Sequence, residues 1–261
     1  MDARTAKRVR AFLHAAADAP ERLLLLDYDG TLANFRINRF TARPWAGIRD
    51  LLNAIQKQKK SRIAVVTGRP PEEIPAMLQL NEPVEVWGLH GAKRLRPNGR
   101  SEMEKQAPAV RQALEGLRKK LRADALGGLF EDKPNAAVMH WRGHVPARAR
   151  AVEERTRTLF EPLAKIEGLC LLEFEAGLEL RAGRDKGGAV EQMVLESAHG
   201  AAVTYLGDDW TDEAGFAAVN AAQGPHLSVL VKRTKRTTAA DLWLKPPEEL
   251  REFLRMWVET E

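Results

Sequence analysis

The sequence predicts an α/β fold, in which an open parallel sheet with helices on both faces is interrupted by a second domain of α+β pattern. Two observations lead to this prediction. Short apolar runs alternate with helical patterns over roughly the first hundred residues, and the same alternation returns after about residue 180. Between them the pattern changes to helices and paired strands, which do not alternate one by one.

The first half of the parallel sheet is predicted from three apolar runs. The run Arg22–Leu26 is bounded by turn residues, which is typical of a strand buried on both faces. Runs at 63–66 and 84–87 have the same character. A helix follows Pro44, with apolar residues at a 3.6-residue period, and another follows Pro71. The order β-α-β-α-β favours parallel strands with right-handed crossovers.

The middle of the chain predicts a separate domain. Its expected elements are a helix at Pro108–Ala123, an alternating strand at 135–141, a long helix at 146–165 and a hairpin formed by Leu169–Phe174 and 177–181. Such a mixture is an α+β pattern. We therefore assign residues 105–179 to an inserted domain, and residues 1–104 and 180–261 to the domain that it interrupts.

The first pattern then resumes toward the end of the chain. The expected elements are a helix near Lys186, a strand at 202–206, a helix from Asp212, a strand at 227–231 and a terminal helix at 246–258.

Composition restricts the classes of partner. The formal net charge is +5 and the isoelectric point is about 9.4. Lys and Arg are scattered along helical stretches, which favours solvated helix faces over a nucleic-acid surface, and the balance also suits a small anionic substrate. We expect a monomer whose partner is a small molecule, with neither nucleic acid nor membrane as a partner.

The single cysteine and the N-terminus bear on location. Cys170 lies in an apolar run, so we expect a buried and inert thiol. The first residues lack the apolar core of a signal peptide, and no apolar run reaches the ~20 residues that span a bilayer. We expect a cytoplasmic protein.

Two clusters of aspartates follow predicted strands. Asp27 and Asp29 come after one strand, and Asp208, Asp209 and Asp212 after another. An open α/β sheet places its active site at the carboxyl ends of its strands, and carboxylates gathered there repel one another without a cation. Hard oxygen ligands suit Mg²⁺, and no Cys/His grouping has the spacing of a zinc site.

We therefore predict a Mg²⁺ site with Asp27, Asp29, Asp208 and Asp212 as candidate ligands. Whether Asp208 completes the metal shell alone or together with Asp209 or Asp212 stays open. Asp212 could instead orient a water molecule or a lysine.

The pair Asp27 and Asp29 suits covalent phosphoryl transfer. The first carboxylate can attack phosphorus to form an acyl phosphate, and the second can protonate the leaving group and then deprotonate water. Thr67 ends a predicted strand and offers a hydroxyl and an N–H to a phosphate oxygen. Lys186 opens a predicted helix, whose N-terminus and positive charge would both stabilise phosphoryl oxygens.

These residues lie in four motifs that resemble those of the haloacid dehalogenase superfamily. The motifs are, in order, Asp27-Tyr28-Asp29-Gly30-Thr31-Leu32, Thr67-Gly68-Arg69, Asp185-Lys186-Gly187 and Gly207-Asp208-Asp209-Trp210-Thr211-Asp212-Glu213. The sequence around these motifs, from residue 23 to about residue 232, resembles that of the trehalose-6-phosphate phosphatases within the superfamily. The resemblance implies a Rossmann-like core with an inserted α/β cap domain.

The resemblance also implies residues that recognise a sugar. This more specific resemblance is carried by His90-Gly91, Glu131-Asp132-Lys133, His140-Trp141-Arg142 and the stretch from Glu179 to Arg181. The substrate-binding candidates are Arg69, His90, Lys133, Arg142 and Glu179. Structural interpretations stand beside them: the cap residues could lie on a solvated sheet face, Arg69 could hold a loop carboxylate, and His90 could be a turn residue. Ala182 stands where the family usually has a proline.

The function that this resemblance implies is hydrolysis of trehalose 6-phosphate by a Mg²⁺-dependent phosphatase. A phosphatase for another glycosyl phosphate, of the sucrose, mannosylglycerate or glucosylglycerol type, would share the core chemistry. A phosphomutase is a third enzymatic alternative. A binding or regulatory module without turnover is the non-enzymatic alternative, although both Asp27 and Asp29 are present here.

Overall fold

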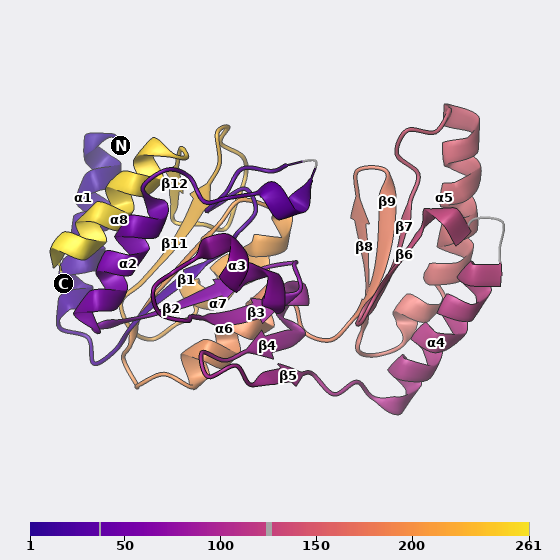
Figure 1. Ribbon diagram of the computed structural model, residues 1–261, viewed down its shortest axis with the longest axis horizontal. Coiled ribbons are helices and arrows are strands. Elements are labelled where there is room, and N and C mark those ends of the chain that lie inside the picture. The colour runs from indigo at the N-terminus through magenta and orange to yellow at the C-terminus, as the bar shows by residue number, and fades with distance from the viewer. Residues whose placement is uncertain (37, 124–126, 261) are drawn as a thin grey trace. The chain divides into compact units, whose positions relative to one another are not determined.

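The chain divides into two compact units (Figure 1). The computed structural model describes residues 1–36, 38–123 and 127–260. Unit 1 comprises Met1–Met103 and Asp185–Glu261, and unit 2 comprises Glu104–Arg184. The predicted insertion of 105–179 starts within one residue of unit 2, but its end falls inside a strand that pairs along its whole length within unit 2. The C-terminal limit of the insertion therefore lies at Arg184.

Unit 1 is built on an eight-stranded sheet in the order β12-β11-β10-β1-β2-β3-β4-β5. Neighbours from β12 to β3 are parallel, and β4 and β5 add an antiparallel edge. The strands are β1 (Arg22–Leu26), β2 (Ser61–Val66), β3 (Glu85–Gly88), β4 (Lys93–Leu95), β5 (Ser101–Met103), β10 (Ala202–Gly207), β11 (His226–Val231) and β12 (Leu242–Leu244). The helices are α1 (Ala3–Ala17), α2 (Ile48–Gln58), α3 (Ile74–Leu78), α6 (Lys186–Leu195), α7 (Glu213–Asn220) and α8 (Glu248–Thr260).

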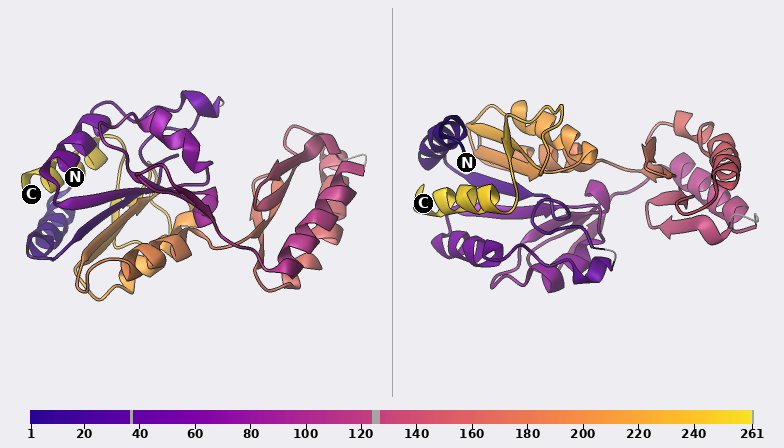
Figure 2. Two further views of the ribbon diagram at one scale, coloured as in Figure 1. Left: turned by 60° about the horizontal axis from the view of Figure 1, so that its bottom comes forward. Right: turned by 90° about the horizontal axis from the view of Figure 1, so that it is seen from above.

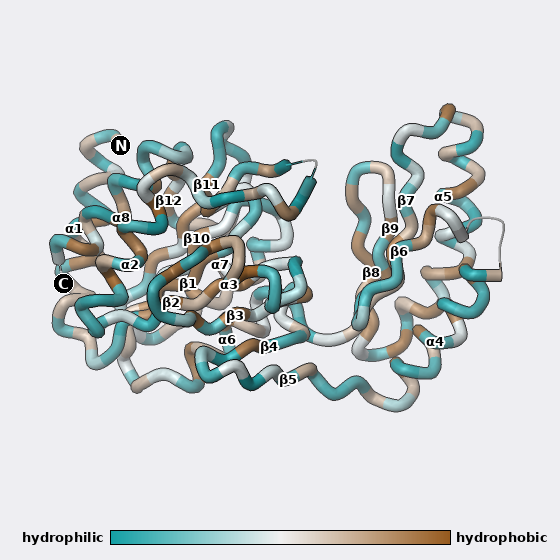
Figure 3. The backbone as a smooth tube through the Cα atoms, in the orientation of Figure 1, coloured by the Kyte–Doolittle hydropathy of each residue, from teal (hydrophilic) through white to brown (hydrophobic). Residues whose placement is uncertain are grey.

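Helices cover both faces of this sheet, as two further views show (Figure 2). Side chains of successive strand residues point to opposite faces, so an apolar strand between two helical layers contributes to two cores. In β1, Leu24 and Leu26 belong to the core under α1, α2, α3 and α8, whereas Leu23 and Leu25 belong to the core under α6 and α7. Hydrophobic residues accordingly concentrate on the central strands (Figure 3).

Unit 2 has a four-stranded antiparallel sheet in the order β6-β7-β9-β8. Its elements are α4 (Pro108–Ala123), β6 (Phe130–Lys133), β7 (Ala136–His140), α5 (Pro146–Phe160), β8 (Leu169–Phe174) and β9 (Gly177–Ala182). Apolar residues of α4 and α5 pack on one face, against Leu178, Leu180 and their neighbours. The alternate residues of β9, Glu179 and Arg181, point to the other face.

The prediction that the Cys170 thiol is buried is wrong, because this residue is exposed. It lies on β8, an edge strand of the unit 2 sheet. Leu169 and Leu171 on either side of it pack against the helical core, so the alternation of the strand turns Cys170 to the opposite face. An apolar run in an edge strand therefore did not imply burial of every residue.

Other differences are local. The predicted helix at 146–165 ends at Phe160, before Pro162, and a 3₁₀ turn, Leu163–Lys165, follows it. The helices expected from Pro71 and near Asp212 begin as 3₁₀ turns, Pro71–Glu73 and Trp210–Asp212. None of the described helices has the length and apolar character needed to cross a bilayer.

Candidate active site at the carboxyl edge of the unit 1 sheet

Adjacent parallel strands bring the two predicted aspartate clusters together. β1 and β10 are hydrogen-bonded neighbours, and Asp27 follows the first while Asp208 follows the second. Gly30 has a φ of +88°, and a Cβ at this position would lie 2.2 Å from Oδ2 of Asp208. A side chain at residue 30 would therefore displace the Asp208 carboxylate, so glycine is required for the close approach of the loop after β1.

Lys186 joins these strands from the first turn of α6. Its Nζ donates to Asp27 Oδ1 and to Asp212 Oδ1, each at 2.7 Å. All three side chains are buried. Burial alone would lower the pKa of Lys186, but the carboxylates of Asp212 and Asp27 outweigh it and raise that pKa. The lysine is therefore a fixed positive charge in contact with the predicted nucleophile.

Asp212 is held on both of its oxygens. Oδ1 also accepts from the Tyr205 hydroxyl, and Oδ2 accepts from the backbone N–H groups of Asp208 and Asp209 at 2.9 Å. Four donors on one carboxylate leave little capacity for another ligand. This geometry supports the prediction that Asp212 orients Lys186.

Asp27 and Asp208 share a strongly acidic environment. Burial raises the pKa of Asp27, and the carboxylates of Asp212 and Asp208 add to this rise against the opposing effect of Lys186. Burial and Asp212 raise the pKa of Asp208 to about 7. The Lys232 Nζ lies 3.7 Å from Asp208 Oδ2 and partly opposes that shift.

The same carboxylates have the donor set of a hard divalent cation. Oxygens of Asp27, Asp208 and Asp212 lie within 4.8 Å of one another. Asp27 Oδ2 is buried and accepts no hydrogen bond from any described residue. A buried carboxylate oxygen without a partner is costly, and a cation would compensate for it. Asp27 and Asp208 therefore fit Mg²⁺, with Asp212 beside them engaged by its four donors, whereas the carboxylate of Asp29, also predicted as a ligand, is not part of this group.

Thr67 and His90 are brought together at the end of β2. Thr67 is buried, its carbonyl accepts from the His90 N–H at 2.9 Å, and its hydroxyl accepts from the Arg69 N–H at 3.3 Å. His90 has a φ of +58°, which is unusual for a residue with a side chain. A Cβ on Gly68 would lie 2.7 Å from the imidazole. The ring therefore packs on the backbone beside Thr67.

Asp29 is paired with Arg69. The Arg69 Nε donates to Asp29 Oδ2 at 2.5 Å, and Nη2 donates to Oδ1 at 2.7 Å. The structure thus shows the predicted alternative for Arg69, a guanidinium that holds a loop carboxylate. Sequence reasoning named both residues but did not pair them.

The candidates of unit 2 are in two places. Lys133 Nζ donates to Glu179 Oε2 at 3.0 Å, and the neighbouring Arg181 guanidinium lies 4.0 Å from Glu179 Oε1. Arg142 instead pairs with Glu175 beside the hairpin turn, and both of these side chains are exposed. Within unit 2 the structure therefore groups Lys133 and Glu179 and leaves Arg142 apart.

Three residues that complete these arrangements were not among the predicted site residues. Tyr205 and Lys232 hold Asp212 and Asp208, and Arg181 lies beside Glu179. Tyr205 lies within a predicted buried strand, where a hydroxyl requires a partner, so its sequence position contained a usable signal. The Trp210 side chain, within the fourth motif, is 65% exposed, and the guanidinium carbon of Arg236 lies 4.3 Å from its ring centroid.

Comparison with known proteins gives one consistent result. A family model described as trehalose-phosphatase matches residues 25–247. The bifunctional trehalose-6-phosphate synthase/phosphatase of Thermoproteus tenax is 32% identical over 203 residues, which cover 77% of this chain and 27% of that protein. The trehalose-6-phosphate phosphatase of Escherichia coli (strain K12) is 26% identical over 207 residues, which cover 78% of this chain and 75% of that protein.

The fold agrees with a solved structure. The C-terminal domain of the C. albicans trehalose-6-phosphate phosphatase superposes with a TM-score of 0.75 at 22% identity, and 96% of each chain is covered. At this level of identity the likeness concerns the fold.

Proposed function

Because the chain belongs to the trehalose-phosphatase family, we propose that it is a phosphoric monoester hydrolase that converts trehalose 6-phosphate into trehalose and inorganic phosphate. One observation supports this most strongly. Asp27 is buried at a strand end with one oxygen on Lys186 and the other without a hydrogen bond from any described residue. This is the arrangement expected of a carboxylate that is oriented for attack.

In the first step, an oxygen of Asp27 attacks phosphorus and the bond from phosphorus to the sugar oxygen breaks. Asp29 gives a proton to that oxygen, and the chain carries an acyl phosphate on Asp27. In the second step, water attacks phosphorus and gives a proton to Asp29. The bond to Asp27 breaks, which restores both carboxyl groups and releases inorganic phosphate.

The other residues stabilise charge and position the groups. Lys186, fixed by Asp27 and Asp212, lies where phosphoryl oxygens would gain negative charge. The Thr67 hydroxyl lies at the end of β2, which neighbours β1. Asp27 and Asp208 would hold Mg²⁺ in the cluster oriented by Asp212, and the ion would neutralise charge on the phosphate.

We further propose that unit 2 recognises the sugar through Lys133 and Glu179. Their direct pair, with Arg181 beside it, forms a charged group on the sheet face opposite the helical core. Hydroxyl groups are well recognised by charged hydrogen-bonding partners of this kind. His90 remains a candidate for substrate contact because its ring lies against Gly68 beside Thr67.

A panel of substrates tests the function directly. Phosphate release with Mg²⁺ is measured for trehalose 6-phosphate, sucrose 6-phosphate, glucose 6-phosphate and glucosylglycerol phosphate. We expect the highest kcat/KM for trehalose 6-phosphate. A higher value for another glycosyl phosphate would reassign the substrate, and no release from any of them would favour a regulatory module.

Substitution of Glu179 tests recognition by unit 2. Glu179→Ala should cost about 2–4 kcal/mol in kcat/KM for trehalose 6-phosphate, because it leaves hydroxyl groups without a charged partner. Hydrolysis of p-nitrophenyl phosphate, which has no sugar, should change much less. The control is Glu173→Ala, which removes a carboxylate of the same hairpin that pairs with Arg157 of α5. Equal losses with both substrates would mean that Glu179 supports the fold instead.

A further inference from the structure

The carboxylate of Asp29 is engaged on both oxygens by one guanidinium. Nε and Nη2 of Arg69 donate to the two oxygens at 2.5 and 2.7 Å, in the fork geometry that fixes the plane of a carboxylate. Each oxygen retains further capacity to accept a hydrogen bond. The Asp29 side chain is 24% exposed, so the pair fixes its orientation without enclosing it.

Arg69 is itself immobilised. Its side chain is 7% exposed, and its guanidinium lies over the ring of Tyr28 with 5.7 Å between the guanidinium carbon and the ring centroid. The remaining terminal nitrogen, Nη1, donates to Glu73 Oε2 at 3.4 Å and approaches the sulfur of Met77. A guanidinium with partners on three sides is a rigid support for Asp29.

Glu73 links this support to a second arginine. It accepts from Arg39 as well as from Arg69, and Arg39 lies in the 3₁₀ turn Arg39–Thr41. The loop that carries Arg39 is tied by bridges from Ala33 to Asp29 and to Pro44. Asp29 is therefore oriented from one side by Arg69, and its backbone is fixed by the loop that follows it.

We propose that Arg69 is a positioning residue that acts through Asp29, and that it does not recognise the sugar. This inference rests on the proposed function, in which Asp29 gives its proton to the sugar oxygen and recovers one from water. A carboxylate free to rotate about its side-chain bonds would spend less time in the geometry of these two transfers. The two hydrogen bonds from Arg69 remove that freedom, and they leave the other lone pairs of the Asp29 oxygens available for proton transfer.

The kinetics of p-nitrophenyl phosphate separate the two steps. Its leaving group is a stable phenolate that needs no proton, so formation of the phosphoenzyme does not depend on Asp29. Breakdown still requires Asp29 to deprotonate water. The variants are Arg69→Met, Arg69→Lys, Asp29→Asn and the double variant Asp29→Asn/Arg69→Met. The control is Glu73→Gln, which removes a negative charge beside Arg69 but keeps an oxygen that can accept from its Nη1 and leaves both hydrogen bonds to Asp29 in place.

In rapid mixing, we expect Asp29→Asn and Arg69→Met to release the first equivalent of p-nitrophenol within about twofold of the wild-type rate. Later turnovers should be slowed by about 10²-fold in Arg69→Met, because misorientation of a catalytic group costs about that much. The later turnovers of the double variant should be at most about threefold slower than those of Asp29→Asn, since both changes remove the same contribution. Arg69→Lys, whose ammonium cannot form a fork, should fall between, and Glu73→Gln should stay near wild type.

Two results would overturn the inference. If the fold-losses in turnover of the two single variants multiply in the double variant, Arg69 acts independently of Asp29. A raised KM for trehalose 6-phosphate with unchanged p-nitrophenyl phosphate kinetics would show that Arg69 contacts the sugar. If Arg69→Met does not fold, Arg69→Lys supplies the same comparison. A wild-type protein that hydrolyses neither substrate would instead refute the proposed function.

Discussion

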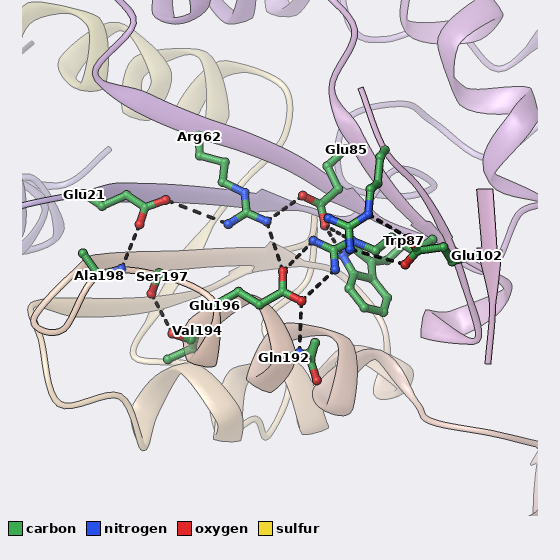
Figure 4. Close-up of polar contacts among 12 residues, drawn as sticks. Glu21, Arg62, Glu85, Trp87, Glu102, Gln192, Val194, Glu196, Ser197 and Ala198 are labelled. Carbon is green, nitrogen blue, oxygen red and sulfur yellow. Dashed lines mark hydrogen bonds and ion pairs between the residues drawn. The ribbon is translucent and has the colours of Figure 1, made fainter. Parts of the chain in front are cut away.

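Unit 1 contains two groups of buried charge, one near each end of α6. At the N-terminus of the helix, Lys186 contacts Asp27 and Asp212. Beyond its C-terminus, Glu196 accepts two hydrogen bonds from Arg94, and Glu85 pairs with both Arg94 and Arg62 (Figure 4). Both groups join α6 to the sheet, but they differ in how their charges are balanced.

The group around Glu85 is balanced, because each of its carboxylates faces an arginine. Glu85 also accepts from the Trp87 indole, and Glu196 accepts from Gln192. The group around Asp27 has three carboxylates near one buried lysine, and Asp27 Oδ2 has no hydrogen bond from the part of the chain described. A balanced network is typical of structure, whereas an acidic excess with a free oxygen indicates a place for a cation and a reacting group.

The largest expected effect is that of Asp27→Asn. The amide is a poor nucleophile and no neighbouring group has its position, so phosphate release should fall by about 10⁴–10⁶-fold. The variant should still fold, because one repulsive charge has been removed from a buried cluster. Activity within tenfold of wild type, or about 1.4 kcal/mol in the barrier, would remove Asp27 from the role of nucleophile.

Metal removal should have an effect nearly as large. Phosphate release should vanish in EDTA and return with Mg²⁺, while Ca²⁺ should inhibit because its looser coordination misplaces the reacting groups. Added Mg²⁺ should also raise the melting temperature of the wild-type protein more than that of Asp208→Asn. Full activity in chelator would contradict the assignment of the cluster.

Substitutions at the two buried cations compare the groups directly. Lys186→Met leaves Asp27 and Asp212 without their counter-charge, and should lower the free energy of unfolding by about 3–5 kcal/mol and abolish turnover. Arg94→Met should destabilise by a similar amount, yet the folded fraction should keep its kcat within about threefold. The measurements are urea unfolding and phosphate release below the transition. Loss of kcat in Arg94→Met would give the second group a functional role.

The smallest expected effect concerns acid stability. The hydrogen bonds from Arg94 lower the pKa of Glu196 to about 2 from its ordinary 4.5. Because the folded-state pKa is depressed, this stabilisation is present above pH 4.5 and is lost as the pH falls toward 2. Glu196→Gln should lower the free energy of unfolding by about 1–2 kcal/mol at neutral pH, allowing for solvent exposure, and by less near pH 3. An equal difference at both pH values would contradict this.

The sequence predicted the members of the acidic cluster because strand order settles their position. Residues at the carboxyl ends of neighbouring parallel strands lie at the same edge of the sheet, so the proximity of Asp27 and Asp208 could be predicted from the sequence alone. The pairing of Asp29 with Arg69 depends on side-chain rotamers of residues 40 positions apart, and no periodicity encodes it. The inserted domain was recognised by its change of pattern, but its end was misplaced within β9.

Short and edge elements were the other weak points. β4, β5 and β12 each have three residues, which is too few for an alternation to be recognised. Cys170 was misjudged because a run of apolar letters does not reveal that one face of an edge strand is open. The exposure of Arg142 likewise follows from its place beside a hairpin turn, which its neighbours in sequence do not specify.

The most direct test of the central claim is the location of the phosphoryl group during turnover. Asp29→Asn, whose second step is slowed, is mixed with Mg²⁺ and p-nitrophenyl phosphate that carries a labelled phosphate, because this leaving group needs no proton from residue 29. The reaction is quenched in acid, the protein is digested, and the labelled peptide is sequenced by mass spectrometry. Our account predicts an acid-stable label on Asp27, absent when Asp27→Asn is added to the same protein. A label on any other residue would contradict the account.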